Sequence, residues 1–251
     1  MRYAAAVNRA KKGSSKRVVA VVLGAGQGTR MGQSINKVFL PINGKPIIVY
    51  AIEVFEHCSL VDEIILVAAA GEEEQMAKLV HHAQCKKVCQ IIEGGATRHE
   101  SEQCALEVLR PHIDAGVVEI VLMHDGARPF ISVEKVEQLI DKAREADGAI
   151  LAAPLEEEER IVQVNSEKCV QRSFEGQQIW KAQTPQVFQA SFLLKAYDQA
   201  RRDQFYGTDT AASVERMGGR VALVESDATN LKITTAEDLF LAEKLSSHRR
   251  F

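Results

Sequence analysis

The sequence predicts an α/β protein with a doubly wound, mostly parallel β-sheet. Three observations carry this prediction. Short apolar runs alternate along the chain with amphipathic stretches of helical period, as is typical of βαβ units. The chain has 251 residues, 46% hydrophobic and 26% charged, as expected for one globular α/β domain. It contains no internal repeat and no apolar run approaching the ~18 residues needed to cross a bilayer, so no membrane contact is expected.

The first βαβ unit is defined by three segments. Residues 18–23 are apolar and end at Gly24, a pattern typical of a strand buried on both faces. Residues 45–58 place apolar side chains at helical spacing, and residues 64–68 read IILVA, which is strand-like. Because two parallel strands need a crossover connection, the three segments predict a strand, a helix and a second strand parallel to the first.

The same cycle repeats along the rest of the chain. Each further helix shows apolar side chains three and four residues apart, and each further strand is a short apolar run. Thr234 and Glu237 are spaced as a capping box ahead of Leu239, which predicts the start of the last helix. The other expected helices are at 72–83, 99–109, 133–146, 191–202 and 209–217, and the other expected strands are at 88–92, 118–123, 148–153 and 221–224.

Two segments fall outside this alternation. Residues 154–183 are short polar stretches, which predicts an arm that projects from the sheet and contacts another subunit; a plain surface hairpin is the alternative. Residues 1–17 are basic and lack the apolar stretch of a secretory signal, so we interpret them as a flexible tail, with an organelle transit peptide as the alternative. The expected organisation is therefore this tail and a single domain at 18–248, with the arm at about 154–183.

Charge and cysteine content exclude further classes. A net charge of -3 and a pI near 6.2 argue against a general nucleic-acid binder, which usually has a strongly basic face. Five cysteines without a secretion signal indicate free thiols in a reducing compartment, and the cytoplasm is the expected location. His81, His82, Cys85 and Cys89 are residue types that bind zinc, but their spacing favours ordinary thiols.

The loop after the first strand has the composition of an anion-binding site. Residues 23–37 read LGAGQGTRMGQSINK, and their glycines are Gly24, Gly26, Gly28 and Gly32. Glycines permit close backbone approach to an anion, and Arg30 and Lys37 add positive charge. The loop has neither the GxGxxG pattern of a dinucleotide-binding dehydrogenase nor a Walker A lysine. Its position at the end of the first strand predicts a triphosphate cradle, with a structural turn as the alternative.

A second charged loop, MHDGARPF, follows the strand expected at 118–123. Asp125 is placed there to hold a divalent cation, and Gly126 leaves room beside it. Arg128 is positioned either to bind a phosphate or to anchor the loop. Because the carboxyl ends of parallel strands share one edge of the sheet, this loop is expected to lie beside the glycine-rich loop.

Two further segments complete the candidate site. The segment EGGATRHES follows the strand at 88–92, and its Gly95, Arg98 and Ser101 could line a base or ribose pocket. Lys232 lies in TNLKITT, just before the last helix. An isolated lysine is usually exposed to solvent, so Lys232 is a candidate site residue only together with the other three loops.

Taken in order, the motifs resemble the 2-C-methyl-D-erythritol 4-phosphate cytidylyltransferases of the non-mevalonate isoprenoid pathway. The motifs are GAGxGTRM, Lys37, EGG with Arg98 and Ser101, HDGARPF, AQTPQVF at 182–188, Thr208 with Asp209, and NLKIT. The resemblance runs from about residue 18 to 245. It includes the related ribitol 5-phosphate cytidylyltransferases, whose FLPxNGKPI segment this chain echoes at 39–47.

The resemblance implies a Rossmann-like nucleotidyltransferase fold and transfer of CMP from CTP to 2-C-methyl-D-erythritol 4-phosphate, with release of pyrophosphate. It implies Mg²⁺ at Asp125 and a homodimer in which the arm of one subunit reaches the site of the other. The implied catalytic residues are Arg30, Lys37 and Lys232. The implied nucleotide-binding residues are Gly24, Ala25, Gly26, Gly28, Gly95, Ser101 and Gly126. The implied substrate-binding positions are Asp125, Arg128, Thr184, Thr208, Glu158 and Gly176.

The chain departs from the family pattern on the acceptor side. Glu158 stands where a Thr usually meets the substrate phosphate, and Gly176 stands where an Arg is usual. Ala96 replaces a common acidic residue, and Thr229 replaces an Asp for which Asp227 could substitute. Three functions therefore stay open: the methylerythritol phosphate enzyme, an enzyme for ribitol 5-phosphate or another polyol phosphate, and a diverged nucleotide-binding protein without catalysis.

Overall fold

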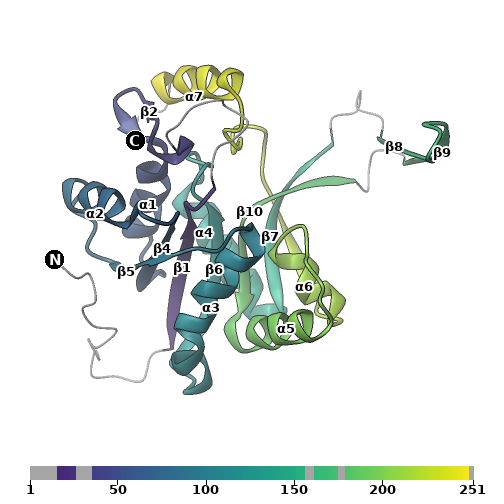
Figure 1. Ribbon diagram of the computed structural model, residues 1–251, viewed down its shortest axis with the longest axis horizontal. Helices are drawn as coiled ribbons and strands as arrows, with labels where there is room; N and C mark the ends of the chain where they lie inside the picture. The colour runs from purple at the N-terminus through teal and green to yellow at the C-terminus, as the bar shows by residue number, and fades with distance from the viewer. Residues whose placement is uncertain (1–15, 27–35, 156–160, 175–178, 249–251) are drawn as a thin grey trace.

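The computed structural model describes residues 16–26, 36–155, 161–174 and 179–248 (Figure 1). The strands of its main sheet are β1 (Arg17–Leu23), β4 (Glu63–Ala68), β5 (Val88–Glu93), β6 (Val118–Asp125), β7 (Gly148–Pro154), β10 (Trp180–Gln189) and β11 (Val221–Glu225). The helices are α1 (Ile47–His57), α2 (Glu73–His82), α3 (Arg98–Asp114), α4 (Val133–Glu145), α5 (Ala190–Arg202), α6 (Thr210–Arg216) and α7 (Ala236–His248). Two short ribbons and a 3₁₀ turn complete the described elements: β2 (Pro41–Ile42) with β3 (Lys45–Pro46), β8 (Ile161–Val164) with β9 (Val170–Phe174), and η2 (Lys37–Phe39).

The main sheet has the strand order β11-β7-β10-β6-β1-β4-β5. β1 pairs in parallel with β4 and β6, β4 with β5, and β11 with β7. β10 is antiparallel to both of its neighbours, β6 and β7. The doubly wound, mostly parallel sheet predicted from the sequence is confirmed.

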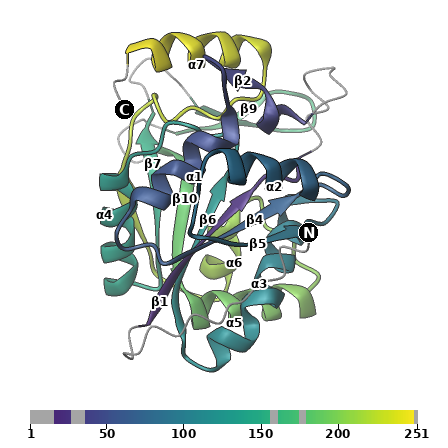
Figure 2. The same cartoon turned by 90° about the vertical axis from the view of Figure 1, so that its left-hand side faces the viewer.

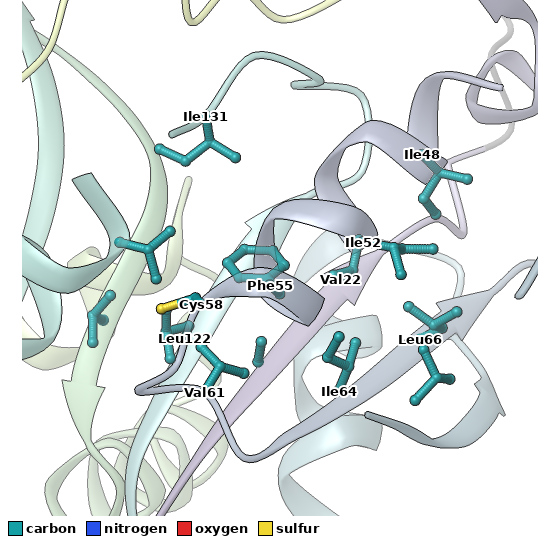
Figure 3. Packing of buried hydrophobic residues seen from close by; sticks show 14 of the residues in the cluster. Val22, Ile48, Ile52, Phe55, Cys58, Val61, Ile64, Leu66, Leu122 and Ile131 are labelled. Carbon is teal, nitrogen blue, oxygen red and sulfur yellow. The ribbon is translucent and has the colours of Figure 1, made fainter. Parts of the chain in front are cut away.

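Alternate residues of β1 pack against opposite layers of helices. Val18, Ala20 and Val22 belong to a buried cluster with residues of α1, α2 and α4, whereas Val19 and Val21 pack with residues of α3, α5 and α6. Figure 3 shows the first layer, with side chains of α1 lying over the strands. Each large apolar side chain buried in this way contributes about 1.5–3 kcal/mol relative to an exposed one. The two layers fix the sheet and therefore the loops at its carboxyl edge.

β10 is a strand that the sequence pattern missed. Its residues WKAQTPQVFQ mix polar and apolar types, and Pro185 cannot donate a hydrogen bond to a neighbouring strand. The pairing register with β7 shifts between Ala182 and Gln186, so the residues between them leave the ladder. This irregularity hides the strand from a period-two pattern, and it also releases Gln183 and Thr184 for side-chain contacts described below.

Helix boundaries follow the predictions with two corrections. α7 begins one residue later than expected: Oγ1 of Thr235 accepts from the backbone N–H of Asp238, and the Asp238 carboxylate accepts from the N–H of Thr235. The predicted pair of Thr234 and Glu237 is therefore wrong by one position. α3 continues to Asp114, beyond the predicted end at 109, because Ile113 is buried in the core of its layer.

α7 lies at the carboxyl end of the strands, above α1 and β2 (Figure 2). It packs through Ala242 against Ile42, Tyr50 and Phe130. The β2 and β3 strands beneath it are joined by Asn43 and Gly44, both with positive φ, as a tight hairpin requires. No helix in the described part of the chain is long and apolar enough to cross a membrane.

The described part of the expected arm is the β8–β9 hairpin, which lies well away from the body of the molecule (Figure 1). Ile161, Val162, Val164 and Val170 of this hairpin are large apolar residues that remain exposed, Val170 at 58%. Contiguous exposed apolar residues often mark contact surfaces. The base of the arm belongs to the main sheet, because residues of β10 from Trp180 onward pair with β7.

Candidate active site

A pocket of about 390 Å³ opens at the carboxyl ends of β1 and β6, beside the loop from β5 to α3. β4 and β6 lie on opposite sides of β1 in the sheet. Open α/β sheets bind ligands at the carboxyl ends of the strands where the strand order reverses in this way. The volume lies in the range of small-molecule sites. The lining residues are Leu23, Ala25, Gly26, Lys37, Val38, Gly95, Ala96, Thr97, Arg98, Ser101, Asp125, Ala127, Lys232 and Thr234.

Of the twelve predicted site residues that the structure describes, seven meet in this pocket. Those that line it are Ala25, Gly26, Lys37, Gly95, Ser101, Asp125 and Lys232. Gly24, Gly126, Arg128, Thr184 and Thr208 are described but do not line it. Gly28, Arg30, Glu158 and Gly176 lie outside the described residues. The structure thus brings together four loops that are widely separated along the chain.

Asp125 is the anionic centre of the pocket. Its carboxylate oxygens lie 2.7 Å from Nζ of Lys232, 3.5 Å from Nη2 of Arg98 and 4.0 Å from Nε of Arg128. Burial alone would raise the pKa of Asp125, but these three cations more than offset it and lower the pKa to about 2. Asp125 is therefore a carboxylate at neutral pH, surrounded by positive charges that an anionic ligand can share.

A series of hydrogen bonds holds the backbone of Asp125 in place. The N–H of Asp125 donates to Oγ1 of Thr184, and that hydroxyl lies 3.2 Å from Nδ1 of His124. Nε2 of His124 lies 3.0 Å from the carbonyl oxygen of Arg128, which can only accept. The proton of a neutral His124 is therefore on Nε2, and Nδ1 accepts from Thr184. Burial lowers the pKa of His124 to about 4, so the ring is neutral near pH 7.

Thr184 and Arg128 consequently support the site from outside the pocket. Thr184 is 2% exposed and its hydroxyl contacts the Asp125 N–H and His124, while direct substrate contact stays a prediction. Nη1 of Arg128 donates to the carbonyl of Asn230 at 2.7 Å, so of its two predicted roles the structure shows loop anchoring. The Asn230 amide donates in turn to Gln183 and to the Thr184 carbonyl. The β10 irregularity, the Asp125 loop and the loop before Lys232 are thereby joined.

Gly24 and Gly126 are required for packing. A Cβ at Gly24 would lie 3.0 Å from side-chain carbons of Ile48 and Met76, and one at Gly126 would lie 2.9 Å from the Leu23 carbonyl. Both distances are shorter than ordinary van der Waals contact. Both let the loops after β1 and β6 lie close to α1; neither lines the pocket, and their nucleotide contact stays a prediction.

Gly95 and Ser101 shape the wall opposite Asp125. A Cβ at Gly95 would collide with Cβ of Glu100, so only glycine allows the loop to turn back over the first turn of α3. This turn is stabilised by a capping box between Thr97 and Glu100. Ser101 donates to the Thr97 carbonyl at 2.9 Å. These contacts within the chain hold the wall in place.

Asn36 is a buried positioning residue that the sequence reading missed. Its amide nitrogen donates to the Gly24 carbonyl and to a Glu72 carboxylate oxygen, both at 2.7 Å. Its oxygen accepts from the N–H of Val38 and caps η2, which begins at Lys37. Asn36 thus ties the far end of the glycine-rich loop to the end of β1 and sets where Lys37 enters the pocket. A single Asn at the end of a loop gives no distinctive sequence signal.

Two acceptor-side residues lie away from this pocket. Thr208 is exposed and precedes Asp209, the N-cap of α6. Asp227, considered as a substitute metal ligand, is exposed and accepts from the backbone N–H of Thr229 at 2.7 Å, while its side chain is not part of the pocket lining. Among the described residues, Asp125 is therefore the carboxylate that lines the pocket.

Glu102 is a second residue that the sequence reading missed. It is 1% exposed on the buried face of α3 and accepts hydrogen bonds from Arg98, Tyr197 and Thr210. A sequence signal existed: Glu102 occupies a position that, by helical spacing from Leu106 and Leu109, belongs to the apolar face.

The zinc alternative finds no support in the described residues, which contain no cluster of three or more His, Cys, Asp or Glu side chains able to hold a metal ion. Cys85 and Cys89 direct their sulfurs to the carbonyls of Ala83 and Ile64. Burial raises the pKa of both thiols to about 11, so they stay protonated.

Comparison with known proteins identifies the family. A family model described as 2-C-methyl-D-erythritol 4-phosphate cytidylyltransferase matches residues 18–247. The chain belongs to this family. A family member named 2-C-methyl-D-erythritol 4-phosphate cytidylyltransferase, from Shouchella clausii, is 40% identical over 230 residues, covering 92% of this chain and 96% of its own.

Solved structures of the family have the same fold. The enzyme of that name from Thermus thermophilus is 30% identical, with a TM-score of 0.70, and the match covers 91% of this chain and 98% of its own. A 4-diphosphocytidyl-2C-methyl-D-erythritol synthase from Anaerococcus prevotii, at 23% identity, aligns with a TM-score of 0.80 over 93% of this chain and 97% of its own. The α/β architecture therefore extends to relatives in which most residues differ.

Proposed function

We propose that this chain is an Mg²⁺-dependent cytidylyltransferase that transfers CMP from CTP to 2-C-methyl-D-erythritol 4-phosphate and releases pyrophosphate. The observation that carries the proposal is the contact of Lys232 with Asp125 inside a pocket that Arg98 and Lys37 also line. Family membership supports the same activity.

The proposed reaction is an in-line displacement. A phosphate oxygen of the acceptor attacks the α-phosphorus of CTP, the new P–O bond forms, and the bond to the leaving pyrophosphate breaks. No protein nucleophile is needed, so catalysis consists of alignment and neutralisation of negative charge. Lys37, Lys232 and Arg98 supply fixed positive charge around the pocket, and we assign Arg30 to the same task from the sequence. The preformed wall at Gly95 and Ser101 is proposed to hold the nucleoside, with Ala25 and Gly26 beside the phosphates.

The described residues fit an Mg²⁺ ion. Mg²⁺ prefers oxygen ligands and usually takes one or two carboxylates together with substrate phosphates. Asp125 offers an ionised, buried carboxylate, and we propose it as the protein ligand. When bound, the ion would neutralise charge on the phosphates. Lys232 and Arg98 already hold Asp125 in its ionised form.

The acceptor is the part of the function for which an alternative has specific support. Glu158 and Gly176 remove a hydroxyl and a cation that the family pattern places near the acceptor phosphate. A carboxylate near a phosphate is repulsive unless a cation offsets it. Ribitol 5-phosphate or another polyol phosphate is therefore the second candidate acceptor.

We further propose that residues 18–248 form one domain, that its arm at about 154–183 joins two copies into a homodimer, and that the enzyme works in the cytoplasm. The exposed apolar residues of β8 and β9 support the arm as a contact surface.

The decisive experiment measures pyrophosphate release from purified protein with CTP and Mg²⁺. Parallel reactions contain 2-C-methyl-D-erythritol 4-phosphate, ribitol 5-phosphate or no acceptor. Release with the first compound alone supports the proposed function, and release with the second alone selects the alternative acceptor. CTP binding without release in any reaction selects the non-catalytic nucleotide-binding protein. Omitting Mg²⁺ tests the metal.

A further inference from the structure

Glu102 places a carboxyl group where the fold would normally place an apolar side chain. It lies on α3 between the helix and the α5–α6 layer and is 1% exposed. Burying a carboxylate costs several kcal/mol unless it is paired and hydrogen-bonded. A residue retained at such a cost needs compensation from its contacts.

The contacts of Glu102 come from three helices. Its Oε1 accepts from Nε of Arg98 at 3.1 Å and from Oγ1 of Thr210 at 2.7 Å, and its Oε2 accepts from the hydroxyl of Tyr197. Arg98 is on α3, Tyr197 on α5 and Thr210 on α6. Both carboxylate oxygens are therefore occupied, and the side chain is held in one orientation.

Arg98 faces both Glu102 and the pocket. Glu102 accepts a hydrogen bond from Nε of Arg98. Nη2, in the same planar guanidinium, lies 3.5 Å from Oδ1 of Asp125. Nη2 is buried and forms no hydrogen bond within the described part of the chain. An unsatisfied buried donor costs about 1–3 kcal/mol, which an acceptor on a bound anion would recover. Since the guanidinium is rigid and planar, fixing Nε also fixes the direction of Nη2.

We propose that Glu102 is a positioning residue that holds Arg98 so that its Nη2 is directed at a phosphate oxygen of CTP beside Asp125. The inference rests on the proposed function, in which CTP occupies this pocket. It assigns Glu102 a role in nucleotide binding although Glu102 does not line the pocket. The competing explanation is that Glu102 only ties α3 to α5 and α6.

The chain offers a matched control for this competing explanation. Arg110 on α3 donates to both carboxylate oxygens of Asp198 on α5, at 3.0 and 2.7 Å. This pair joins two of the helices that Glu102 joins, and neither residue lines the pocket. Glu102→Gln and Asp198→Asn each replace a carboxylate by an amide of the same shape. Both variants weaken the helix layer, but only Glu102→Gln weakens the charge-assisted hydrogen bond that holds Arg98.

The test is the dissociation constant of CTP, measured by calorimetry in the presence of Mg²⁺, together with the KM for CTP. For Glu102→Gln we expect both to rise about five- to tenfold, the size of one lost hydrogen bond between charged groups. Asp198→Asn should leave both within about twofold while lowering the melting temperature. Loss of folded protein alone lowers the apparent kcat without changing the KM, so the affinity separates positioning from stability.

A double-mutant cycle with Arg98→Lys completes the test. In that background Glu102→Gln should change CTP affinity by less than about twofold, because lysine has no rigid planar fork in which fixing one N–H donor sets the direction of another. Equal effects of Glu102→Gln in both backgrounds, or an unchanged CTP affinity in the single variant, overturn the proposal. If Glu102→Gln does not fold, Arg98→Ala with added guanidinium chloride replaces it; rescue of CTP binding supports the proposal, and absence of rescue overturns it.

The failure of the proposed function would look different. In that case the wild-type chain releases no pyrophosphate with any acceptor, whereas CTP affinity still reports on Glu102. A wild-type chain that does not bind CTP at all overturns both.

Discussion

Nζ of Lys232 lies 2.7 Å from Oδ2 of Asp125, although one residue precedes the last helix and the other ends the sixth strand. The pair is only partly shielded, because 36% of the Lys232 side chain is exposed. Its lysine is therefore close enough to neutralise Asp125 and accessible enough to turn to a phosphate. The contact explains how several cations can be gathered around one carboxylate without mutual repulsion dominating.

Removing Lys232 is expected to reduce catalysis strongly. Lys232→Ala should lower kcat for pyrophosphate release by about a hundredfold or more, because fixed charge at a reacting phosphate is among the largest contributions to catalysis. Lys142→Ala is the control: Lys142 is exposed on α4 and pairs only with Glu145 among the contacts described. Steady-state kinetics of both variants checks this, and a kcat for Lys232→Ala within threefold of wild type would contradict it.

Burial of His124 is expected to lower the free energy of unfolding in acid. Its folded-state pKa of about 4 lies below the usual 6.5, so the unfolded chain binds more protons between these values. The stability that neutral His124 provides is complete above about pH 6.5 and is lost as the pH falls to about 4, a total of about 3 kcal/mol. Urea unfolding of metal-free protein across this range measures it. His124→Asn should show a flatter profile, and parallel profiles would contradict the assignment.

Two neighbouring glycines should behave differently. Gly24→Ala places a methyl group against Ile48 and Met76 and should lower the free energy of unfolding by about 1–3 kcal/mol. Gly26→Ala meets nothing within 4 Å and should leave stability unchanged. Since Gly26 lines the pocket, its variant should instead weaken CTP binding. Thermal melts and calorimetry of both proteins distinguish the two roles, and equal destabilisation would refute the distinction.

Replacing Asn36 by Asp is expected to create a repulsion that a second substitution relieves. Asn36→Asp turns two donated hydrogen bonds into a carboxylate that faces the Gly24 carbonyl and the Glu72 carboxylate. The expected cost is about 1–3 kcal/mol of stability and a higher KM for CTP. Adding Glu72→Gln should recover part of both losses, because the new amide can donate to the carboxylate. An additive double variant would show that the contact with Glu72 does not matter.

The arm predicts a dimer that depends on apolar contacts. Val164→Asp and Val170→Asp add charge to side chains that are 47% and 58% exposed on the hairpin. If the arm joins two copies, light scattering after size-exclusion chromatography should show a dimer for wild type and a monomer for the double variant. Lys168→Asp, in the hairpin turn, is the control. A monomeric wild type would remove the proposed homodimer.

The sequence predicted those parts of the fold that are encoded locally. The strand at 18–23 and the helix at 45–58 follow from apolar spacing, and both form nearly as expected. β10 does not follow from spacing, because it is inserted antiparallel between β6 and β7 and contains Pro185. Its position depends on contacts with strands that precede it by many residues.

The same distinction holds for the site. That Lys37 and Asp125 share one pocket could be predicted, because both belong to charged loops that follow strands of one sheet. The support beneath them could not, since His124, Thr184 and Glu102 acquire their roles from partners on distant elements. The resemblance places Thr184 at the substrate, and the structure adds a contact in which its hydroxyl holds the backbone N–H of Asp125.

β10 connects the end of β7 with the backbone of Asp125 within one strand. Its first residues, Trp180 to Ala182, pair with the end of β7 where the arm leaves the body, and two residues later Thr184 holds the backbone of Asp125. Thr184 therefore belongs to the same strand as the residues that flank the base of the expected arm. A displacement of Trp180 to Ala182 would reach the backbone of Asp125 within a few residues of chain, so the base of the arm and the floor of the pocket are expected to move together.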